Sequence, residues 1–395
     1  MASFSIGRLP RVEFGAGSLA KLPEIAARYG QRWLIVTGGR SFRESSRAEP
    51  LLDALKARGC AWDFVPVSGE PSPERVDETV RDWRGEGIDG VIGIGGGSAL
   101  DAAKAIAGLL RPGNSVMDHL EGVGPELPYG GPATPFIAVP TTAGTGSEAT
   151  KNAVLSRHGP DGFKKSFRDD KLMAEYAIVD PDLLATCPPE LIAANGMDAF
   201  TQLLEAYVSI RANPITDALA WRGLEAAREG LLKWYSGGEE AALGREKMAL
   251  ASLLSGICLA QAGLGSVHGL AQPLGSLFPI PHGVVCGTLV AAATRINIEV
   301  MRARDPGNRA LAKYAQVGRL FARTGEVEEA EAQAMLVAAL EEWTQAMKLP
   351  RLSALGVAEA DLPRVVANSR GSSMKTNPVA LTDEEVARVV RARLG

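Results

Sequence analysis

The sequence is poor in the two residue types that most often form disulfides or bind transition metals. Only four cysteines and four histidines occur among its 395 residues. No two cysteines form a CxxC pair, so we expect neither a disulfide framework nor a cysteine-based zinc site. Histidine chemistry is likewise confined to four positions. These scarce residues are Cys60, Cys187, Cys258 and Cys286, and His119, His158, His268 and His282.

An excess of charge of either sign is also missing. Lys and Arg total 42 against 46 Asp and Glu, a net charge of −4. This balance argues against nucleic acids and anionic membranes as partners, because both favour basic proteins. The composition, 46% hydrophobic and 22% charged, is typical of a globular protein, and the length predicts two or three domains. The N-terminus lacks an apolar run of signal-peptide length, so a cytoplasmic protein is expected.

Residues 248–294 contain no Asp, Glu, Lys or Arg. An uninterrupted apolar run of about 20 residues would indicate a membrane-spanning helix. This stretch is interrupted by several glycines and by Gln261, His268, Gln272, Pro273 and Pro279. We therefore predict buried core helices around an internal polar site, and no membrane segment.

Strand-like and helix-like segments alternate in the first half of the chain, which predicts a parallel sheet covered by helices. The expected strands cover residues 32–36, 61–67, 90–94 and 136–139, and the expected helices cover 50–58, 73–86 and 99–110. The second half has long helical patterns and no convincing strand. Its expected helices cover residues 189–211, 214–235, 244–262, 310–324, 328–347 and 383–394.

This change of pattern places a domain boundary near Cys187. We expect an α/β domain at residues 1–187 and an all-helical domain at residues 188–395. No flexible linker separates them, so we expect two domains that close on a shared ligand-binding cleft.

A glycine-rich turn follows the strand expected at residues 90–94. Its residues are Gly95, Gly96, Gly97 and Ser98, and a helix follows. Glycines let the backbone approach a pyrophosphate, and a helix start offers free N–H groups. Ser98 can cap the helix and donate to a phosphate oxygen. The turn only approximates the dinucleotide-binding fingerprint, so an ordinary tight turn capped by Ser98 is the alternative.

A second polar loop, residues 140–148, follows the strand expected at 136–139. It carries two glycines and four hydroxyl side chains, those of Thr141, Thr142, Thr145 and Ser147. These groups suit ribose, phosphate or a nicotinamide amide, although a solvated loop has the same composition. Two such loops at consecutive strand ends favour a dinucleotide, because ligands gather at the carboxyl ends of parallel strands.

Polar residues also cluster in the helical half. Asp198 and Gln202 are four residues apart and share one helix face. His268 and His282 lie in the uncharged stretch. Carboxylate and imidazole together suit a first-row divalent metal, whereas a lone buried histidine is usually a satisfied core residue.

Together these motifs resemble the iron-containing (group III) alcohol dehydrogenase family over nearly the whole chain. The resemblance implies a dehydroquinate synthase-like architecture, with an N-terminal dinucleotide-binding α/β domain, an all-helical C-terminal domain and a metal between them. It also implies a homodimer. The stretches that carry it are residues 12–17, 95–98, 140–148, 177–181, 196–209, 269–283 and 376–378.

The resemblance also assigns roles to single residues. It implies a metal bound by Asp198, Gln202, His268 and His282, and it places Asp101 near the nicotinamide. Further residues implied at the cofactor or the substrate are Lys164 and Asn152. Asp101 and Lys164 each have the alternative of an exposed helix or loop charge.

Two positions depart from the family pattern. Gln202 stands where a ligand histidine is usual, and Gln272 stands where a histidine implicated in proton transfer is usual. A glutamine amide is neutral and exchanges no proton near pH 7. We therefore expect a weakened metal site in which Gln202 is marginal or does not bind, and Zn²⁺ in place of Fe²⁺ or substoichiometric metal. The alternatives are a fully occupied site in which the amide oxygen or a water replaces the imidazole, and metal-free catalysis in which protein hydrogen bonds polarise the carbonyl.

The resulting prediction is an NAD(P)-dependent oxidoreductase that interconverts a small alcohol with its aldehyde or ketone. Asp101, His268 and Gln272 are the expected catalytic positions, and a metal would polarise the substrate oxygen. One alternative is a dehydroquinate synthase-like lyase that uses NAD transiently, but the uncharged stretch lacks the basic pocket it would need. A degenerate dinucleotide-binding protein is the other.

The end of the first strand bears on the choice of cofactor. NAD-preferring members carry an Asp there, whereas this chain has Gly38, Gly39, Arg40, Ser41 and Arg43. Glycines, a hydroxyl and two guanidinium groups can accept a 2′-phosphate. We expect NADP preference or dual use, with exposed turn charges as the alternative.

Overall fold

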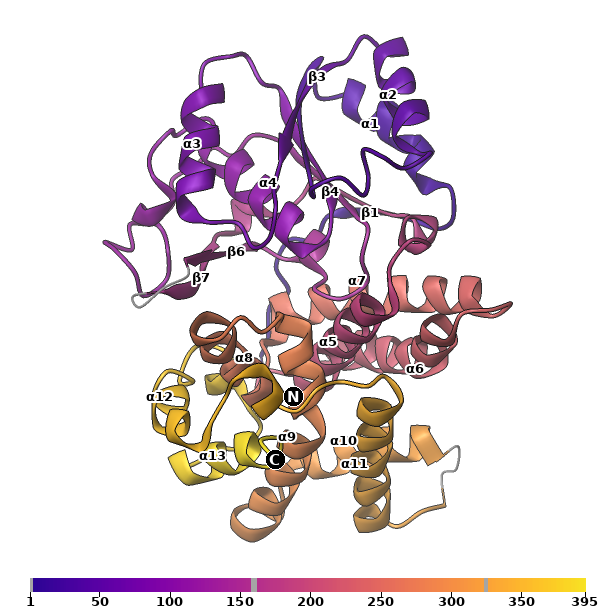
Figure 1. The fold of residues 1–395 in the computed structure, drawn as a ribbon, viewed down its shortest axis with the longest axis vertical. Helices are drawn as coiled ribbons and strands as arrows, with labels where there is room; N and C mark the ends of the chain where they lie inside the picture. Colours follow the sequence, from indigo (N-terminus) through magenta and orange to yellow (C-terminus); the bar gives the residue numbers. More distant parts are fainter. Residues whose placement is uncertain (1–2, 158–161, 323–325) are drawn as a thin grey trace. The chain divides into compact units, whose positions relative to one another are not determined.

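The computed structural model describes residues 3–157, 162–322 and 326–395 (Figure 1). His158, one of the four histidines, lies outside the described residues. The described chain forms two compact units. One comprises Ile6–Thr186, and the other comprises Cys187–Gly395 with residues 3–5.

The first unit is built on a six-stranded, entirely parallel sheet, which confirms the predicted fold class. Its strand order is β1-β8-β5-β4-β2-β3. The strands are β1 (Arg11–Phe14), β2 (Arg32–Thr37), β3 (Ala61–Pro66), β4 (Gly90–Gly95), β5 (Phe136–Pro140) and β8 (Tyr176–Val179).

Helices cover both faces of this sheet (Figure 1). Alternate residues of β2 divide between two cores, as the period of a strand requires. Trp33 and Ile35 pack in one core with α1 (Leu22–Ala27) and α2 (Ala48–Ala57). Leu34 and Val36 pack in the other core with α3 (Pro73–Trp83) and α4 (Gly97–Leu109). The sheet is therefore doubly wound.

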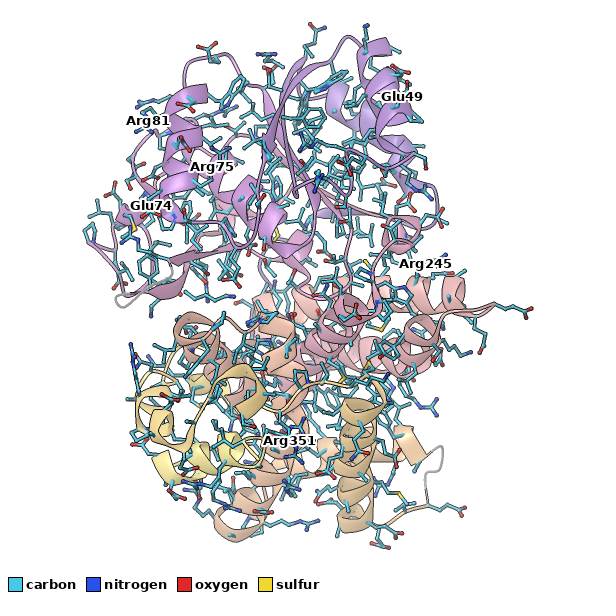
Figure 2. The ribbon with its side chains drawn as sticks, viewed as in Figure 1. Glu49, Glu74, Arg75, Arg81, Arg245 and Arg351 are labelled. Carbon is cyan, nitrogen blue, oxygen red and sulfur yellow. The ribbon has the colours of Figure 1, made fainter. Side chains whose placement is uncertain are left out.

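Helix α3 shows how the local sequence sets these elements. The Ser72 side chain caps the helix by accepting a hydrogen bond from the backbone N–H of Arg75 at 3.2 Å. Val76 and Val80, four residues apart, are buried against the sheet, whereas charged side chains such as Arg81 lie on the outer face (Figure 2). An amphipathic pattern of period 3.6 therefore places this helix correctly.

An antiparallel pair of strands in the first unit was not predicted. Strands β6 (Asn152–Arg157) and β7 (Phe163–Arg168) pair in register, with Asn152 opposite Arg168. Their sequences, NAVLSR and FKKSFR, are too polar and too short to give a clear alternating pattern. Tertiary packing beside α4 compensates for that weak local signal.

The second unit is helical throughout its described residues, again as predicted. Its helices are α5 (Pro189–Val208), α6 (Pro214–Ser236), α7 (Ala241–Ala262), α8 (Ser266–Leu277), α9 (His282–Arg304), α10 (Arg309–Ala322), α11 (Glu329–Ala346), α12 (Leu362–Ala367) and α13 (Asp383–Arg391).

The uncharged stretch forms most of α7, all of α8 and the first half of α9. Helix α9 is long and apolar enough to cross a membrane, but 83% of its most apolar window is buried inside the protein. Burial of this kind supports the expected core helices around a polar site.

Helices α6 and α7 approach each other at backbone distance. A Cβ on Gly244 would lie 2.5 Å from the backbone N of Trp234, and a Cβ on Gly230 would lie 2.9 Å from the carbonyl oxygen of Gly244. Since neither backbone can give way easily, these two glycines set the separation of the helices.

This contact predicts the effect of Gly244→Ala. Alanine has a helix propensity better than glycine by about 1 kcal/mol. We nevertheless expect a loss of roughly 1–3 kcal/mol in stability, because the methyl group overpacks the helix crossing. The thermal unfolding midpoint measures it. Gly307, which has open space around its Cα, is the control position. A midpoint for Gly244→Ala at or above that of wild type would contradict the prediction.

Candidate functional site

The first candidate site lies where the order of the strands reverses. The chain passes from β2 outward to β3 and then returns to β4 on the other side of β2. Thr37 pairs with Ile94 across these two strands, so Gly38 and Gly95 follow side by side at their carboxyl ends. Parallel α/β sheets bind ligands at such a switch point.

Both predicted loops meet at this point. A Cβ on Gly95 would lie 3.3 Å from the backbone N of Gly38 and 2.6 Å from the Cβ of Ala99. A Cβ on Gly96 would lie 3.3 Å from Thr142, and one on Gly97 would lie 2.7 Å from the Cγ2 of Thr145. The three glycines therefore let the threonine loop pack directly on the start of α4.

The predicted cap of α4 is wrong. The N-cap is Gly96, which makes no side-chain capping bond, and Ser98 is the second residue of the helix. Strand β4 ends at Gly95 and helix α4 already begins at Gly97, so Ser98 lies inside the helix and cannot cap it. The start of α4 still presents backbone N–H groups at the switch point.

Asp101 is held in a buried network that joins α4 to the second loop. Its Oδ1 accepts a hydrogen bond from the Oγ of Ser147 at 2.5 Å, and its Oδ2 accepts one from the backbone N–H of Val154 at 3.2 Å. The side chain is 13% exposed, so the alternative of an exposed helix charge does not describe it. Burial raises the pKa of Asp101, against the opposing effect of Lys104.

Lys104, which the sequence analysis did not single out, lies at the centre of this network. It is fully buried, and its Nζ donates to the Ser147 carbonyl, Ser147 Oγ, Thr150 Oγ1 and the Asn152 carbonyl at 2.8–3.0 Å. Burial lowers its pKa to about 8. The spacing Asp101-x-x-Lys104 was the signal available in the sequence, because it places both groups on one helix face.

The other cofactor and substrate candidates lie in the same unit. Thr141 donates its backbone N–H to the carbonyl of Gly95 at 2.9 Å. Asn152 begins β6, and Lys164, on β7, has a side chain that is 11% exposed and paired with Glu70. Lys164 is thus a partly buried ion-pair residue, not the exposed loop charge considered as its alternative.

The basic residues after β2 differ in their surroundings. Arg43 donates to the carbonyl of Gly39 at 2.7 Å, which fixes its guanidinium next to the turn. Arg40 is 82% exposed and lies 3.8 Å from Glu44. Ser41 is exposed between them.

Glu148 gives a pH-dependent prediction for this unit. It is 2% exposed, and burial raises its pKa from 4.5 to about 7. The folded state therefore binds the proton of Glu148 more tightly than the unfolded state does. Protonation of Glu148 stabilises the folded protein at low pH, and this stabilisation is lost as the pH rises from about 4.5 to about 7. Glu148→Gln cannot ionise. Its stability relative to wild type should rise by about 3 kcal/mol over that interval.

Unfolding free energies of both proteins between pH 4 and pH 8 measure this difference. The exposed Glu49, changed to Gln, is the matched control and should show no comparable trend. A constant difference between Glu148→Gln and wild type across the interval would show that burial does not raise the pKa of Glu148.

The second candidate site lies in the helical unit, where three helices bring polar side chains together. Asp198 comes from α5, His268 from α8 and His282 from α9. Asp198 Oδ1 lies 3.1 Å from His268 Nε2 and 3.9 Å from His282 Nε2. One ligand atom from each of these residues and from Cys286 lies within 4.8 Å of all the others. His119 belongs to the other unit, where its ring stacks on Phe167.

Glycines bring α9 against α5 at this point. A Cβ on Gly283 would lie 2.4 Å from the carbonyl oxygen of Ala194, and one on Gly287 would lie 2.8 Å from the Cβ of Met197. Each of these glycines directly follows a member of the cluster on α9, Gly283 after His282 and Gly287 after Cys286. The close approach therefore places both side chains next to Asp198.

Glu205, another residue that the sequence analysis missed, orients His268. Its Oε2 accepts a hydrogen bond from His268 Nδ1 at 2.7 Å, and its Oε1 accepts one from the backbone N–H of Val267 at 2.7 Å. With Nδ1 protonated, Nε2 points toward Asp198. A carboxylate behind a histidine in this way is the usual support of a metal ligand. Glu205 follows Asp198 by seven residues, two helical turns, which was the available signal.

The charges of the cluster favour a cation at its centre. Burial opposes ionisation of Asp198, yet His282 and His268 lower its pKa to about 2. Burial would lower the pKa of His268, but Cys286, Asp198 and Glu205 outweigh that effect and raise it well above its usual value. The donor set, one carboxylate and two imidazoles, fits a divalent metal.

The two glutamines lie near the cluster but differ from its members. Gln202 is buried one turn after Asp198, and its Oε1 accepts a hydrogen bond from Ser255 at 3.0 Å. Gln272 follows His268 by one turn on α8, where its Oε1 would lie 3.0 Å from a Cβ on Gly371.

Comparison with known proteins matches one family over nearly the whole chain. The profile of the iron-containing alcohol dehydrogenases matches residues 10–181, and the profile of the C-terminal region of that family matches residues 192–394.

Individual proteins match over nearly the whole chain. Alcohol dehydrogenase 4 of Schizosaccharomyces pombe is 34% identical over 96% of this chain and 87% of its own. An NADPH-dependent butanol dehydrogenase of Clostridium saccharobutylicum is 31% identical, over 91% of this chain and 88% of its own. The crystal structure of a 1,3-propanediol oxidoreductase superposes with a TM-score of 0.87 at 28% identity, and covers 99% of this chain and 100% of that one. The resemblance predicted from the motifs is thus confirmed, and this protein belongs to the iron-containing alcohol dehydrogenase family.

Proposed function

We propose that this protein is an NAD(P)-dependent dehydrogenase of small alcohols, or a reductase of the corresponding aldehydes. The unit Ile6–Thr186 would bind the dinucleotide, and the unit Cys187–Gly395 would bind the metal and the substrate. The observation that carries the proposal is the cluster of buried Asp198, buried His268 and partly exposed His282 in a chain that also has a glycine loop at the switch point of a parallel sheet.

The glycine loop would hold the pyrophosphate. Gly95, Gly96 and Gly97 leave the backbone accessible at the start of α4, where the helix dipole favours an anion. Thr142 and Thr145 lie against these glycines and would donate to the cofactor. Asp101 would lie beside the nicotinamide, held in place by Ser147 and Lys104, which support the ring site without contacting it.

The cluster in the helical unit would hold the metal. Asp198, His268 and His282 present their ligand atoms together, and Glu205 fixes the tautomer of His268. A divalent metal bound there supplies a Lewis acid for the substrate oxygen. Asp198 and His268 are buried, which strengthens their electrostatic interactions, whereas the side chain of His282 is 28% exposed.

Gln272 limits the ways in which a proton can leave the substrate. Its amide donates and accepts hydrogen bonds but transfers no proton near pH 7. In this proposal Gln272 orients the substrate, and the proton is exchanged with solvent. We further propose a cytoplasmic homodimer without nucleic-acid or membrane partners, supported by the balanced charge and the buried α9.

A spectrophotometric assay of nicotinamide oxidation tests the proposed function. Purified protein, freed of metal by chelation and then loaded with Zn²⁺ or Fe²⁺, should oxidise NADPH or NADH when small aldehydes are added. The chelated protein should be much slower, because the carbonyl loses its Lewis acid. Failure to oxidise either cofactor on a broad panel of aldehydes and ketones would overturn the proposal. Conversion of a substrate without net cofactor oxidation would indicate a lyase instead.

We propose in addition that NADP is accepted at least as well as NAD. No carboxylate ends β2, and Arg40, Ser41 and Arg43 follow two glycines at the switch point. The NADPH dependence of the butanol dehydrogenase relative supports this assignment.

Arg40→Ala tests the cofactor assignment. Loss of one exposed guanidinium that reaches the 2′-phosphate should lower kcat/KM for NADPH roughly tenfold and leave kcat/KM for NADH almost unchanged. Steady-state kinetics with both cofactors measures the change. Arg58→Ala, at an exposed position just beyond α2, is the control and should alter neither value. Equal losses with NADH and NADPH would contradict the assignment.

A further inference from the structure

Cys286 is the fourth member of the cluster in the helical unit. It is fully buried on α9, one turn after His282, so both side chains point to the same side of the helix. Its Sγ lies 3.6 Å from His268 Nε2 and 3.8 Å from His282 Nε2. The sequence analysis predicted no cysteine-based site because no CxxC pair occurs, whereas here a single cysteine joins one histidine four residues away and two residues from other helices.

The distances match a tetrahedral coordination shell. With metal–nitrogen and metal–oxygen bonds of about 2.0–2.2 Å and a metal–sulfur bond of about 2.3 Å, neighbouring ligand atoms lie roughly 3.3–3.7 Å apart. Four pairs in the cluster are separated by 3.1, 3.6, 3.8 and 3.9 Å. A small shift of each side chain is enough to place all four on one ion.

The amide oxygen of Gln202 lies 3.0 Å from Ser255 Oγ, and as a neutral hard donor it is a weaker ligand than a thiolate for a borderline-soft metal such as Zn²⁺. Cys258 shows how a buried cysteine without such a role is satisfied in the same unit. Its Sγ donates to the carbonyl of Thr216 at 3.6 Å. The thiol of Cys286 instead has two imidazole nitrogens next to it.

We propose that Cys286 binds the metal as a thiolate, joins Asp198, His268 and His282 as a fourth protein ligand with the substrate oxygen as a fifth, and makes that site select zinc over ferrous iron. The inference rests on the metal site of the proposed function. A soft thiolate favours Zn²⁺ over Fe²⁺, which also stands lower in the Irving–Williams order. Binding replaces the S–H bond by a metal–sulfur bond and releases the proton to solvent.

Cobalt spectroscopy tests the inference directly. Co²⁺ bound to the chelated wild-type protein should give visible d–d bands and, from the thiolate, a charge-transfer band in the near ultraviolet. Cys286→Ser should retain the visible bands and lose the charge-transfer band. Cys258→Ser, a buried cysteine in α7, is the matched control and should keep both.

Different spectra would overturn the metal site and the role of Cys286. Visible bands without a charge-transfer band in the wild type overturn the role of Cys286 and leave the metal site standing. Absence of any cobalt bands overturns the metal site and this inference together. The wild-type spectrum decides both cases even if a variant does not fold.

Metal competition tests the selectivity. Titration of the wild-type protein with Zn²⁺ against a chromophoric chelator should give a Kd at least about tenfold lower than that of Cys286→Ser, whereas Fe²⁺ affinity should change less. Gln202→Ala should bind zinc as the wild type does. Equal zinc affinities for wild type and Cys286→Ser, or a large loss in Gln202→Ala, would show that cysteine is not the ligand.

Discussion

The imidazole of His268 is held between two carboxylates, and the candidate metal centre of the helical unit is built around that interaction. Asp198 and Glu205 lie two turns apart on α5, so both reach the same ring from one helix face. A buried charge has to be balanced inside the protein, because no water is available to do so. The close approach of α9 through Gly283 and Gly287 supplies the remaining two donors.

A buried charge is also balanced by protein groups in the first unit, at Lys104. Its ammonium group is buried, and four oxygen acceptors from the second loop and β6 surround it. These bonds tie the threonine loop to α4, and they fix Asp101 through Ser147. Lys104 therefore connects the threonine loop and β6 to α4. A buried charged group thus organises each unit, an ammonium surrounded by oxygen atoms in the first and an imidazole between two carboxylates in the second.

Membership of the family fixes the fold and the general chemistry, but the residues of the site determine how that chemistry is done. Gln202 and Gln272 replace two histidines that the family pattern leads one to expect. In the structure, Gln202 is engaged by Ser255, and a thiol from α9 lies within the ligand cluster. A donor lost from one helix is thus compensated by a donor on another, which changes the softness of the site and with it the preferred metal.

The sequence by itself determined the parallel α/β fold of the first unit, the helices of the second and the loops of the switch point. Those features follow from local periodicity and from glycine positions, because the apolar residues of a buried face recur every two residues in a strand and every 3.6 residues in a helix. Asp198, His268 and His282 were also identified, through motif resemblance.

The short polar strands β6 and β7 lacked a local signal, and the predicted Ser98 cap was wrong because strand β4 enters helix α4 directly. Only the tertiary structure showed Cys286, Glu205 and Lys104 as parts of the two sites. Each has a neighbour within seven residues on its own helix, but the contacts that reveal its role, with His268 for the first two and with Ser147 for Lys104, span 18, 63 and 43 residues. Proximity across such separations depends on how distant segments pack, and no period in the sequence encodes it.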